Sequence, residues 1–173
     1  MIEKKKLILG SAGKVAKDAI TLDIDPNHEP DLVHNLNIFP WPFNNDQFTE
    51  IICHHVIEHL NDLSPVMNEL HRICSPEGVI YIEVPHHTAW CANVPEHKLR
   101  FNYFAFDGYI ATGITKWMTG VKFELLDRKI TFHRSFRRVM LHKLFNKFSM
   151  SYEKFWAYIF PAEFLNVWLK PLK

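Results

Sequence analysis

Four short, mostly apolar runs constrain this chain more than any other feature. The runs are KKLILG (5–10), AITLDID (19–25), FTEIICHHV (48–56) and GVIYIEVP (78–85). Runs of this length, rich in Ile, Leu and Val, predict buried strands. An amphipathic segment between the third and fourth runs predicts a helix, with Ser64 as N-cap and Pro65 at its first position. Strands, loops and a helix in this order predict an open α/β sheet.

The remaining segments give weaker signals. DLVHNL (31–36) alternates weakly, whereas the prolines and asparagines of FPWPFNND (39–46) predict a loop. FELLDRKITF (123–132) indicates a late strand or hairpin. Patterns with helical period cover three later segments: 103–118, 134–147 and 151–169. With 173 residues, one domain is expected.

Charge divides this domain, predicted over residues 1–173, into a core over about 5–132 and a helical extension over about 133–173. Residues 1–132 hold 12 Lys and Arg against 17 Asp and Glu, whereas residues 133–173 hold 8 against 2. The extension also holds 10 of the 24 aromatic residues. Such a segment is typical of a surface for membranes, nucleic acids or acidic partners. We expect peripheral membrane contact or a homodimer face and no nucleic acid; a helical cap with a solvated basic face is the simpler alternative.

The cysteines and the N-terminus indicate the cellular compartment in which the protein is expected to lie. Three cysteines are an odd number, and Cys53 and Cys74 lie in apolar patterns, so we expect reduced core thiols. The N-terminal apolar run is too short for a secretory signal. Residues 155–169 are too short and too polar to span a bilayer. The expected location is the cytoplasm.

The segment CHHVIEHLND (53–62) allows several interpretations. His55, Glu58 and His59 match the H-x-x-E-H pattern of one class of zinc enzyme. That chemistry requires both histidines on a stable helix, yet only about six residues separate the preceding strand from the next helix. A plain connection, in which Glu58 and His59 cap local backbone, is a second interpretation. We expect no metal, and Glu58 and His59 as structural residues.

A third interpretation is that EIICHHVIEHLND resembles the segment after the fourth strand of class I S-adenosylmethionine (SAM)-dependent methyltransferases. LILGSAGKVAKDAITLDIDP (7–26) is similar to the glycine loop and second strand of the family's type 11-like, short-loop branch. Three further segments are similar to later motifs: DLVHNLNIFPWPFNNDQFTEII (31–52), ELHRICSPEGVIYIEVPH (69–86) and PEHKLRFNYFAFDGY (95–109). The resemblance covers roughly residues 5–110 and implies a Rossmann-like open, mostly parallel sheet.

The resemblance also implies how SAM would be bound. A glycine-containing turn lets backbone N–H groups approach a ligand, and an acidic residue after the second strand can accept hydrogen bonds from ribose hydroxyls. The polar residue after the third strand would read the adenine, and the residues after the fourth would line the methionine end. The implied cofactor-binding residues are Gly10, Ser11, Ala12, Asp23, Asn35, Leu36, His54 and His55.

Methyl transfer needs an aligned nucleophile and a group that removes its proton. Histidines near the strand ends are candidate bases because they titrate near neutral pH. The candidates are His86, His87 and His97. The expected reaction is methylation of oxygen or nitrogen in a small molecule or glycan.

Two departures from the family pattern keep other functions open. Ala12 stands where the family usually has a second glycine, and Asn35 where it often has Asp. Both changes would weaken SAM binding, so the alternative function is a catalytically inactive SAM-fold binding module. A zinc hydrolase that uses the His55–His59 motif is the third possibility.

Overall fold

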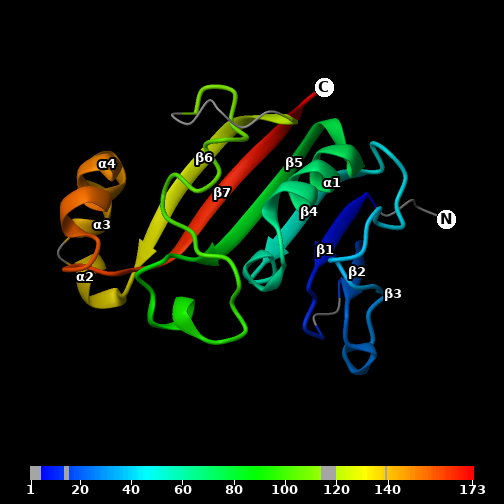
Figure 1. Cartoon of the computed structure of the whole chain (residues 1–173), viewed down its shortest axis with the longest axis horizontal. Helices are drawn as coiled ribbons and strands as arrows, with labels where there is room; N and C mark the ends of the chain where they lie inside the picture. Colours follow the sequence, from blue (N-terminus) through cyan, green and yellow to red (C-terminus); the bar gives the residue numbers. More distant parts are fainter. Residues whose placement is uncertain (1–4, 14–15, 114–119, 139) are drawn as a thin grey trace.

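A single seven-stranded sheet forms the centre of the protein, with strand order β3-β2-β1-β4-β5-β7-β6 (Figure 1). The structure, a computed structural model, describes residues 5–13, 16–113, 120–138 and 140–173. The strands are β1 (Lys6–Leu9), β2 (Ala19–Asp23), β3 (Leu32–Val33), β4 (Phe48–His54), β5 (Cys74–Pro85), β6 (Lys122–Phe132) and β7 (Ala162–Leu172). The open, mostly parallel α/β sheet predicted from the sequence is therefore confirmed.

Parallel pairing brings the ends of several strands to one edge. β1 pairs in parallel with both β2 and β4, and β4 pairs in parallel with β5. β7 lies between β5 and β6 and runs antiparallel to both. The turns that follow β1, β2, β4 and β5 therefore meet at one edge, which we call the carboxyl edge.

One face of the sheet is covered by α1 (Leu63–Ile73) (Figure 1). Its buried apolar residues are Val66, Met67, Leu70 and Ile73. The predicted start of this helix is corrected by a few residues. Asp62, not Ser64, is the N-cap, because its carboxylate accepts the N–H of Ser64 at 2.9 Å.

The core behind this face contains two of the three cysteines. Cys53 and Cys74 are buried, and all three cysteines are free, as the sequence predicts. Side chains on the opposite face, such as Ile8, Ile52 and Tyr81, are only partly buried. The main apolar core therefore lies on the α1 side of the sheet.

Short helical turns connect several strands. They are η1 (Pro26–His28) after β2, η2 (Ile57–His59) after β4 and η3 (Trp90–Asn93) after β5. The helix predicted over 103–118 is wrong in its described part. Residues 103–113 form turns and a bridge from Ile110 to Phe123, and the rest of that segment lies outside the described residues.

The C-terminal segment is helical only in its first half. The helices are α2 (Arg134–Arg138), α3 (Leu141–Lys147), α4 (Ser149–Ser151) and the π-helical turn η4 (Tyr152–Trp156), beside the end of β6 (Figure 1). The helix predicted over 151–169 is therefore wrong beyond Trp156, because Ala162–Leu172 forms β7. Across the part of the chain that the structure describes, no helix is long and apolar enough to cross a membrane.

Burial explains why the last segment is a strand. Leu165, Val167 and Leu169 are completely buried at alternate positions, which is the period of a strand. Asn166 lies between them, and its side-chain oxygen accepts the hydroxyl of Tyr81 at 2.7 Å. β7 therefore belongs to the core of the sheet and not to an appended helix.

Truncation of Leu165 tests the place of β7. Leu165→Ala should lower the free energy of unfolding by about 2–5 kcal/mol because it empties a fully buried site. Leu126→Ala, at a β6 position that is 45% exposed, is the matched control and should lower the free energy of unfolding far less. Urea unfolding measures both; equal effects would contradict the buried position of β7.

Candidate active site

A tight turn after β1 begins the site. Gly10 has φ +67°, and a Cβ atom added there would lie 2.8 Å from Val56 side-chain atoms. Ala12 has φ +47°, a region that L-residues other than glycine rarely adopt. Its N–H nevertheless donates to Asp23 Oδ2 at 2.8 Å. The turn is thus formed with alanine at the position where the family usually has glycine.

Asp23 at the end of β2 holds this turn and a second one. Its Oδ1 accepts the N–H of Asp25 at 3.0 Å and lies 3.3 Å from His28 Nδ1. Burial alone would raise the pKa of Asp23, but the hydrogen bonds from Asp25, Ala12 and His28 outweigh it and lower that pKa. Asp23 is therefore a carboxylate at neutral pH.

A cavity of about 380 Å³ opens beside these turns at the carboxyl edge. Six of the predicted cofactor-binding residues line it: Gly10, Ala12, Asp23, Asn35, Leu36 and His55. Ser11 and His54 do not line it, and Ser11 is buried. The volume lies within the roughly 300–1,000 Å³ of ordinary small-molecule sites.

Asn35 offers a ligand its side-chain nitrogen and not its side-chain oxygen. Its Oδ1 accepts the N–H of Asn37 at 3.0 Å and lies 3.3 Å from Asn37 Nδ2. The side-chain oxygen is therefore occupied locally, and the amide Nδ2 is the group that remains for a ligand.

Two carboxylates surround His55 on the cavity wall. Its Nδ1 lies 3.2 Å from Glu58 Oε1, and its Nε2 lies 3.2 Å from Glu83 Oε1. His54 Nε2 reaches the same Glu83 oxygen at 2.9 Å. The hydrogen bonds to Glu58 and Glu83 raise the pKa of His55 to about 9. The wall thus carries a protonated imidazole that is paired with two carboxylates.

The H-x-x-E-H segment is not a helix. Ile57–His59 forms the single turn η2, and His55 has a left-handed backbone with φ +53°. Among the residues that the structure describes, His55 and His59 do not share a cluster of potential metal ligands. The geometry of the H-x-x-E-H zinc enzymes is therefore not formed.

A second cavity of about 440 Å³ lies at the same edge. It is lined by Leu63, His87, Leu99, Arg100, Phe101, Asn102 and Ala105. Lys98 lines the first cavity and its neighbour Leu99 lines the second. The backbone around residues 97–99 is therefore a partition between the two cavities.

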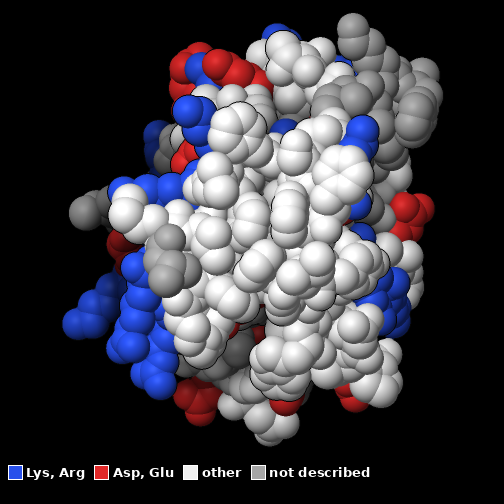
Figure 2. All heavy atoms as spheres, turned by 90° about the vertical axis from the view of Figure 1, so that its left-hand side faces the viewer, with Lys and Arg blue, Asp and Glu red and all other residues white. Residues whose placement is uncertain are grey.

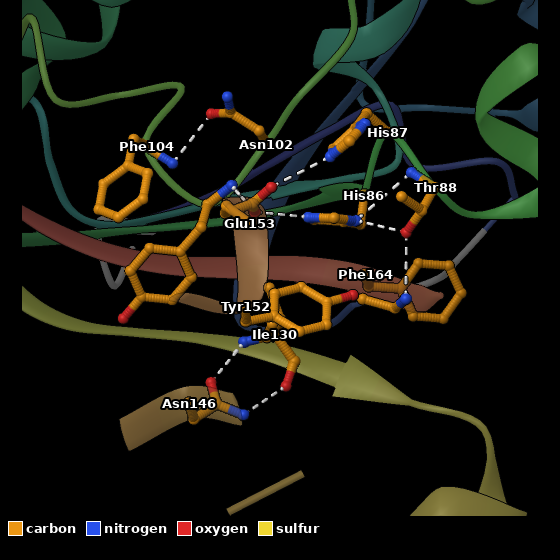
Figure 3. Close-up of polar contacts among 12 residues, drawn as sticks. His86, His87, Thr88, Asn102, Phe104, Ile130, Asn146, Tyr152, Glu153 and Phe164 are labelled. Atoms are coloured by element: carbon orange, nitrogen blue, oxygen red, sulfur yellow. Dashed lines mark hydrogen bonds and ion pairs between the residues drawn. The ribbon is translucent and has the colours of Figure 1, made fainter. Parts of the chain in front are cut away.

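Glu153 of η4 joins three segments behind the second cavity (Figure 3). Its Oε1 lies 2.8 Å from His86 Nε2 and accepts the N–H of Tyr103 at 2.7 Å. Its Oε2 lies 3.1 Å from His87 Nε2. Burial opposes ionisation, but the bonds to His86 and His87 lower the pKa of Glu153 to about 2. Glu153 is therefore an ionised anchor between η4 and the end of β5.

The three candidate bases occupy different environments. His86 is fully buried; its Nδ1 lies 2.7 Å from Thr88 Oγ1, and burial lowers its pKa despite Glu153. His87 lines the second cavity. His97 lines neither cavity, and its pKa is lowered, mainly by burial. Geometry therefore favours His87 among the three.

Sequence reasoning did not identify several residues of this site. Glu153 lies 66 residues after His87, so no local pattern links them. His34, which directly follows β3, also lines the first cavity, as do Asn37 and Lys98 from loops without a strand-end signal. The basic and aromatic character of the C-terminal segment indicated an interaction surface but not an inward-facing carboxylate.

Comparison with known proteins shows which family and which fold this chain resembles. A family model described as methyltransferase domain matches residues 12–82. A search among curated proteins finds no match. The match and the fold together confirm the resemblance to class I SAM-dependent methyltransferases.

Three solved structures illustrate the similarity of fold. A SAM-dependent methyltransferase from Archaeoglobus fulgidus is 14% identical with a TM-score of 0.55, and covers 95% of this chain and 85% of its own. One from Mesorhizobium loti is 11% identical with a TM-score of 0.55, covering 96% and 90%. A candidate methyltransferase in complex with the Haloferax volcanii Trm112 activator is 15% identical with a TM-score of 0.59, covering 98% and 84%.

Acid unfolding tests the anchor formed by Glu153. Because the pKa of Glu153 is lowered to about 2 from 4.5, its contribution is complete above about pH 4.5 and is lost as the pH falls toward 2. Glu153→Gln should remove up to about 3 kcal/mol at neutral pH and flatten the decline of stability below pH 4.5.

Urea unfolding at pH 7, 4 and 3 measures the effect. The control Glu77→Gln replaces a largely exposed carboxylate that pairs with Lys170, and it should leave the profile unchanged. His86 adds a decline below pH 6.5 in all three proteins, because its pKa is lowered in the folded state. Identical profiles for the two variants would contradict the anchor.

Proposed function

We propose that this protein, whose residues 12–82 match the methyltransferase domain family and whose fold is that of class I methyltransferases, transfers a methyl group from SAM. One observation carries the proposal. The cavity at the carboxyl edge is bounded by the glycine turn after β1 and by the Asp23 carboxylate after β2. These two features sit where open α/β sheets bind nucleotide-like ligands.

The residues of the first cavity fit SAM by their chemistry. The Asp23 carboxylate is the acceptor for ribose hydroxyls, and Asn35 Nδ2 is a donor for an adenine ring nitrogen. The carboxylates of Glu58 and Glu83 pair with His55 on the cavity wall and so offset the positive charge of its imidazole near a cationic sulfonium. When bound, SAM supplies an activated methyl group, so the protein needs only to align the acceptor and remove its proton.

His87 is the proposed general base in the second cavity. Its Nε2 is directed to Glu153, which holds the ring and leaves Nδ1 as the basic nitrogen. The acceptor oxygen or nitrogen would lose its proton to His87 as it bonds to the methyl carbon of SAM, whose bond to the sulfonium sulfur would break and leave S-adenosylhomocysteine. This role makes Glu153 a positioning residue, which acts through His87.

The second cavity suits a polar acceptor. Arg100 and Asn102 stand among apolar residues on its wall, so an acidic or hydroxylated small molecule or glycan matches it best. An inactive binding module is disfavoured, because the turn at Ala12 is formed and its N–H meets Asp23.

Calorimetric titration with SAM and S-adenosylhomocysteine tests the cofactor site. We expect micromolar binding to the wild type and at least ten-fold weaker binding to Asp23→Ala, since a hydrogen bond to a charged group contributes about 1.5–3 kcal/mol. Asp127→Ala, at an exposed carboxylate of β6, is the control and should bind normally. Absence of binding up to millimolar ligand would refute the proposed function.

We further propose a partner surface on the C-terminal helices, called here the apolar face. Its exposed apolar residues are Met140, Leu144, Phe148, Met150, Phe155, Trp156, Tyr158 and Ile159. The exposed basic residues of the same segment are Arg134, Arg137, Arg138, Lys143, Lys147 and Lys154. Figure 2 shows uncharged atoms across the centre of this side of the molecule and basic groups at its margins.

Two polar side chains of this segment point inward. Glu153, the sole acidic residue of 133–160, binds His86 and His87. Asn146 binds both the N–H and the carbonyl of Ile130, at 2.8 Å each. An ordinary helical cap has polar groups on its outer side, whereas this segment exposes the residues of the apolar face there. Aromatic groups with a basic margin suit the surface of an anionic membrane.

Vesicle co-sedimentation tests this surface. The protein should bind vesicles that contain anionic phospholipid and not neutral phosphatidylcholine vesicles, and added salt should weaken the binding. Phe155→Ser with Trp156→Ser should abolish it, whereas Leu126→Ser on β6 should not. Equal binding to anionic and neutral vesicles would refute the proposal. A protein that binds neither kind of vesicle but forms a dimer that the double variant disrupts would also refute it.

A further inference from the structure

A buried carboxylate beside the cofactor cavity lacks a partner on one oxygen. The Glu58 side chain is 1% exposed, and its Oε1 is paired with His55. Its Oε2 is buried and has no hydrogen-bond partner. An unpaired buried carboxylate oxygen is costly, so its environment calls for a missing positive group or donor.

Two histidines lie close to the carboxyl group of Glu58. Glu58, His59 and His97 each offer one ligand atom, and the three atoms lie within 4.8 Å of one another. His97 Nδ1 is also buried without a hydrogen-bond partner. Two residues of this cluster, Glu58 and His97, thus each have a buried polar atom without a hydrogen-bond partner, and both atoms are of types that bind metal ions.

The His59 ring is already oriented for metal binding. Its Nδ1 lies 3.2 Å from the carbonyl oxygen of Glu96, which leaves the Nε2 lone pair as its free ligand. Metal-binding histidines commonly donate their second ring N–H to a carbonyl in this way. The backbone adds rigidity, because the N–H groups of Lys98 and Leu99 both donate to the Glu58 carbonyl, at 2.8 and 3.1 Å.

Two other clusters of the same composition provide a contrast. In the cluster of His54, His55 and Glu83, the second Glu83 oxygen accepts the hydroxyl of Tyr81 at 2.9 Å. In the cluster of His86, His87 and Glu153, both carboxylate oxygens are bonded. Among the described clusters, unsatisfied buried atoms therefore occur in the one built on Glu58.

We propose that Glu58, His59 and His97 bind one divalent transition-metal ion such as Zn²⁺. Two imidazole nitrogens and one carboxylate oxygen form a typical ligand set for that ion and leave a fourth position open. Bonds of about 2.0–2.2 Å would draw the three atoms to within about 3.5 Å of one another, a small closure from the present arrangement.

The position of the ion gives it a role. His59 lines the first cavity, and His97 belongs to the partition, next to Lys98 and Leu99. The ion would tie the partition to η2 and so fix the wall between the two cavities. This role is separate from the H-x-x-E-H enzymes, because His55 is not a ligand.

The test uses Co²⁺ as a spectroscopic probe on the full, chelator-treated chain. We expect visible absorption that saturates at one Co²⁺ per chain and is displaced by Zn²⁺. Glu58→Gln and His97→Ala should each weaken Co²⁺ binding at least ten-fold, with the fold checked by circular dichroism. His59→Ala, at an exposed side chain, repeats the test without disturbing the core.

The other two clusters supply the controls. His54→Ala and His87→Ala should retain Co²⁺ binding and its displacement by Zn²⁺. No binding below millimolar Co²⁺ would overturn the proposal and leave a buried water as the partner of Glu58. Binding that survives His97→Ala but fails in a control variant would also overturn it. None of these measurements requires SAM, so the outcome is independent of the proposed methyl transfer.

Discussion

Parallel pairing of β1 with β2 and β4, and of β4 with β5, is the constraint on which the site depends. Because these strands share one direction, the chain leaves each of them at the same edge of the sheet. The turn at Gly10, the carboxylate of Asp23 and the imidazole of His55 are thereby brought together from segments far apart in the sequence. The two cavities then need only one further element, the partition at residues 97–99.

The sequence predicted the parts of the fold that have a local signature. Apolar runs closed by turn residues located β1, β2, β4 and β5, because burial on both sides of a strand leaves a continuous apolar pattern. The same reasoning failed at β7. Its segment, at 162–172, follows an aromatic stretch that continues a helical pattern, and period alone does not separate a short buried strand from a helix. Pro161 was the available signal for a break.

The sequence also predicted some of the site residues and missed others. Asp23, Asn35 and His55 were identified because each lies at or just after the carboxyl end of a strand. Glu153 could not be identified, since its partners His86 and His87 are distant in sequence and its role depends on tertiary packing. The H-x-x-E-H motif is a case in which the sequence matches but the structure does not. The left-handed backbone at His55 and the single turn η2 direct the two histidines of the motif to different neighbours.

The inner position of β7 also has a consequence for synthesis of the chain. β5 and β6 both pair with β7 and lie on opposite sides of it in the sheet order. A ribosome therefore delivers β6 well before the strand that joins it to the sheet. Translation from residue 132 to residue 172 takes roughly 2–8 s at about 5–20 residues per second. Throughout that interval the edge of β5 is an open template for pairing with another chain. The nascent protein thus exposes this edge of its sheet until the last strand has been synthesised.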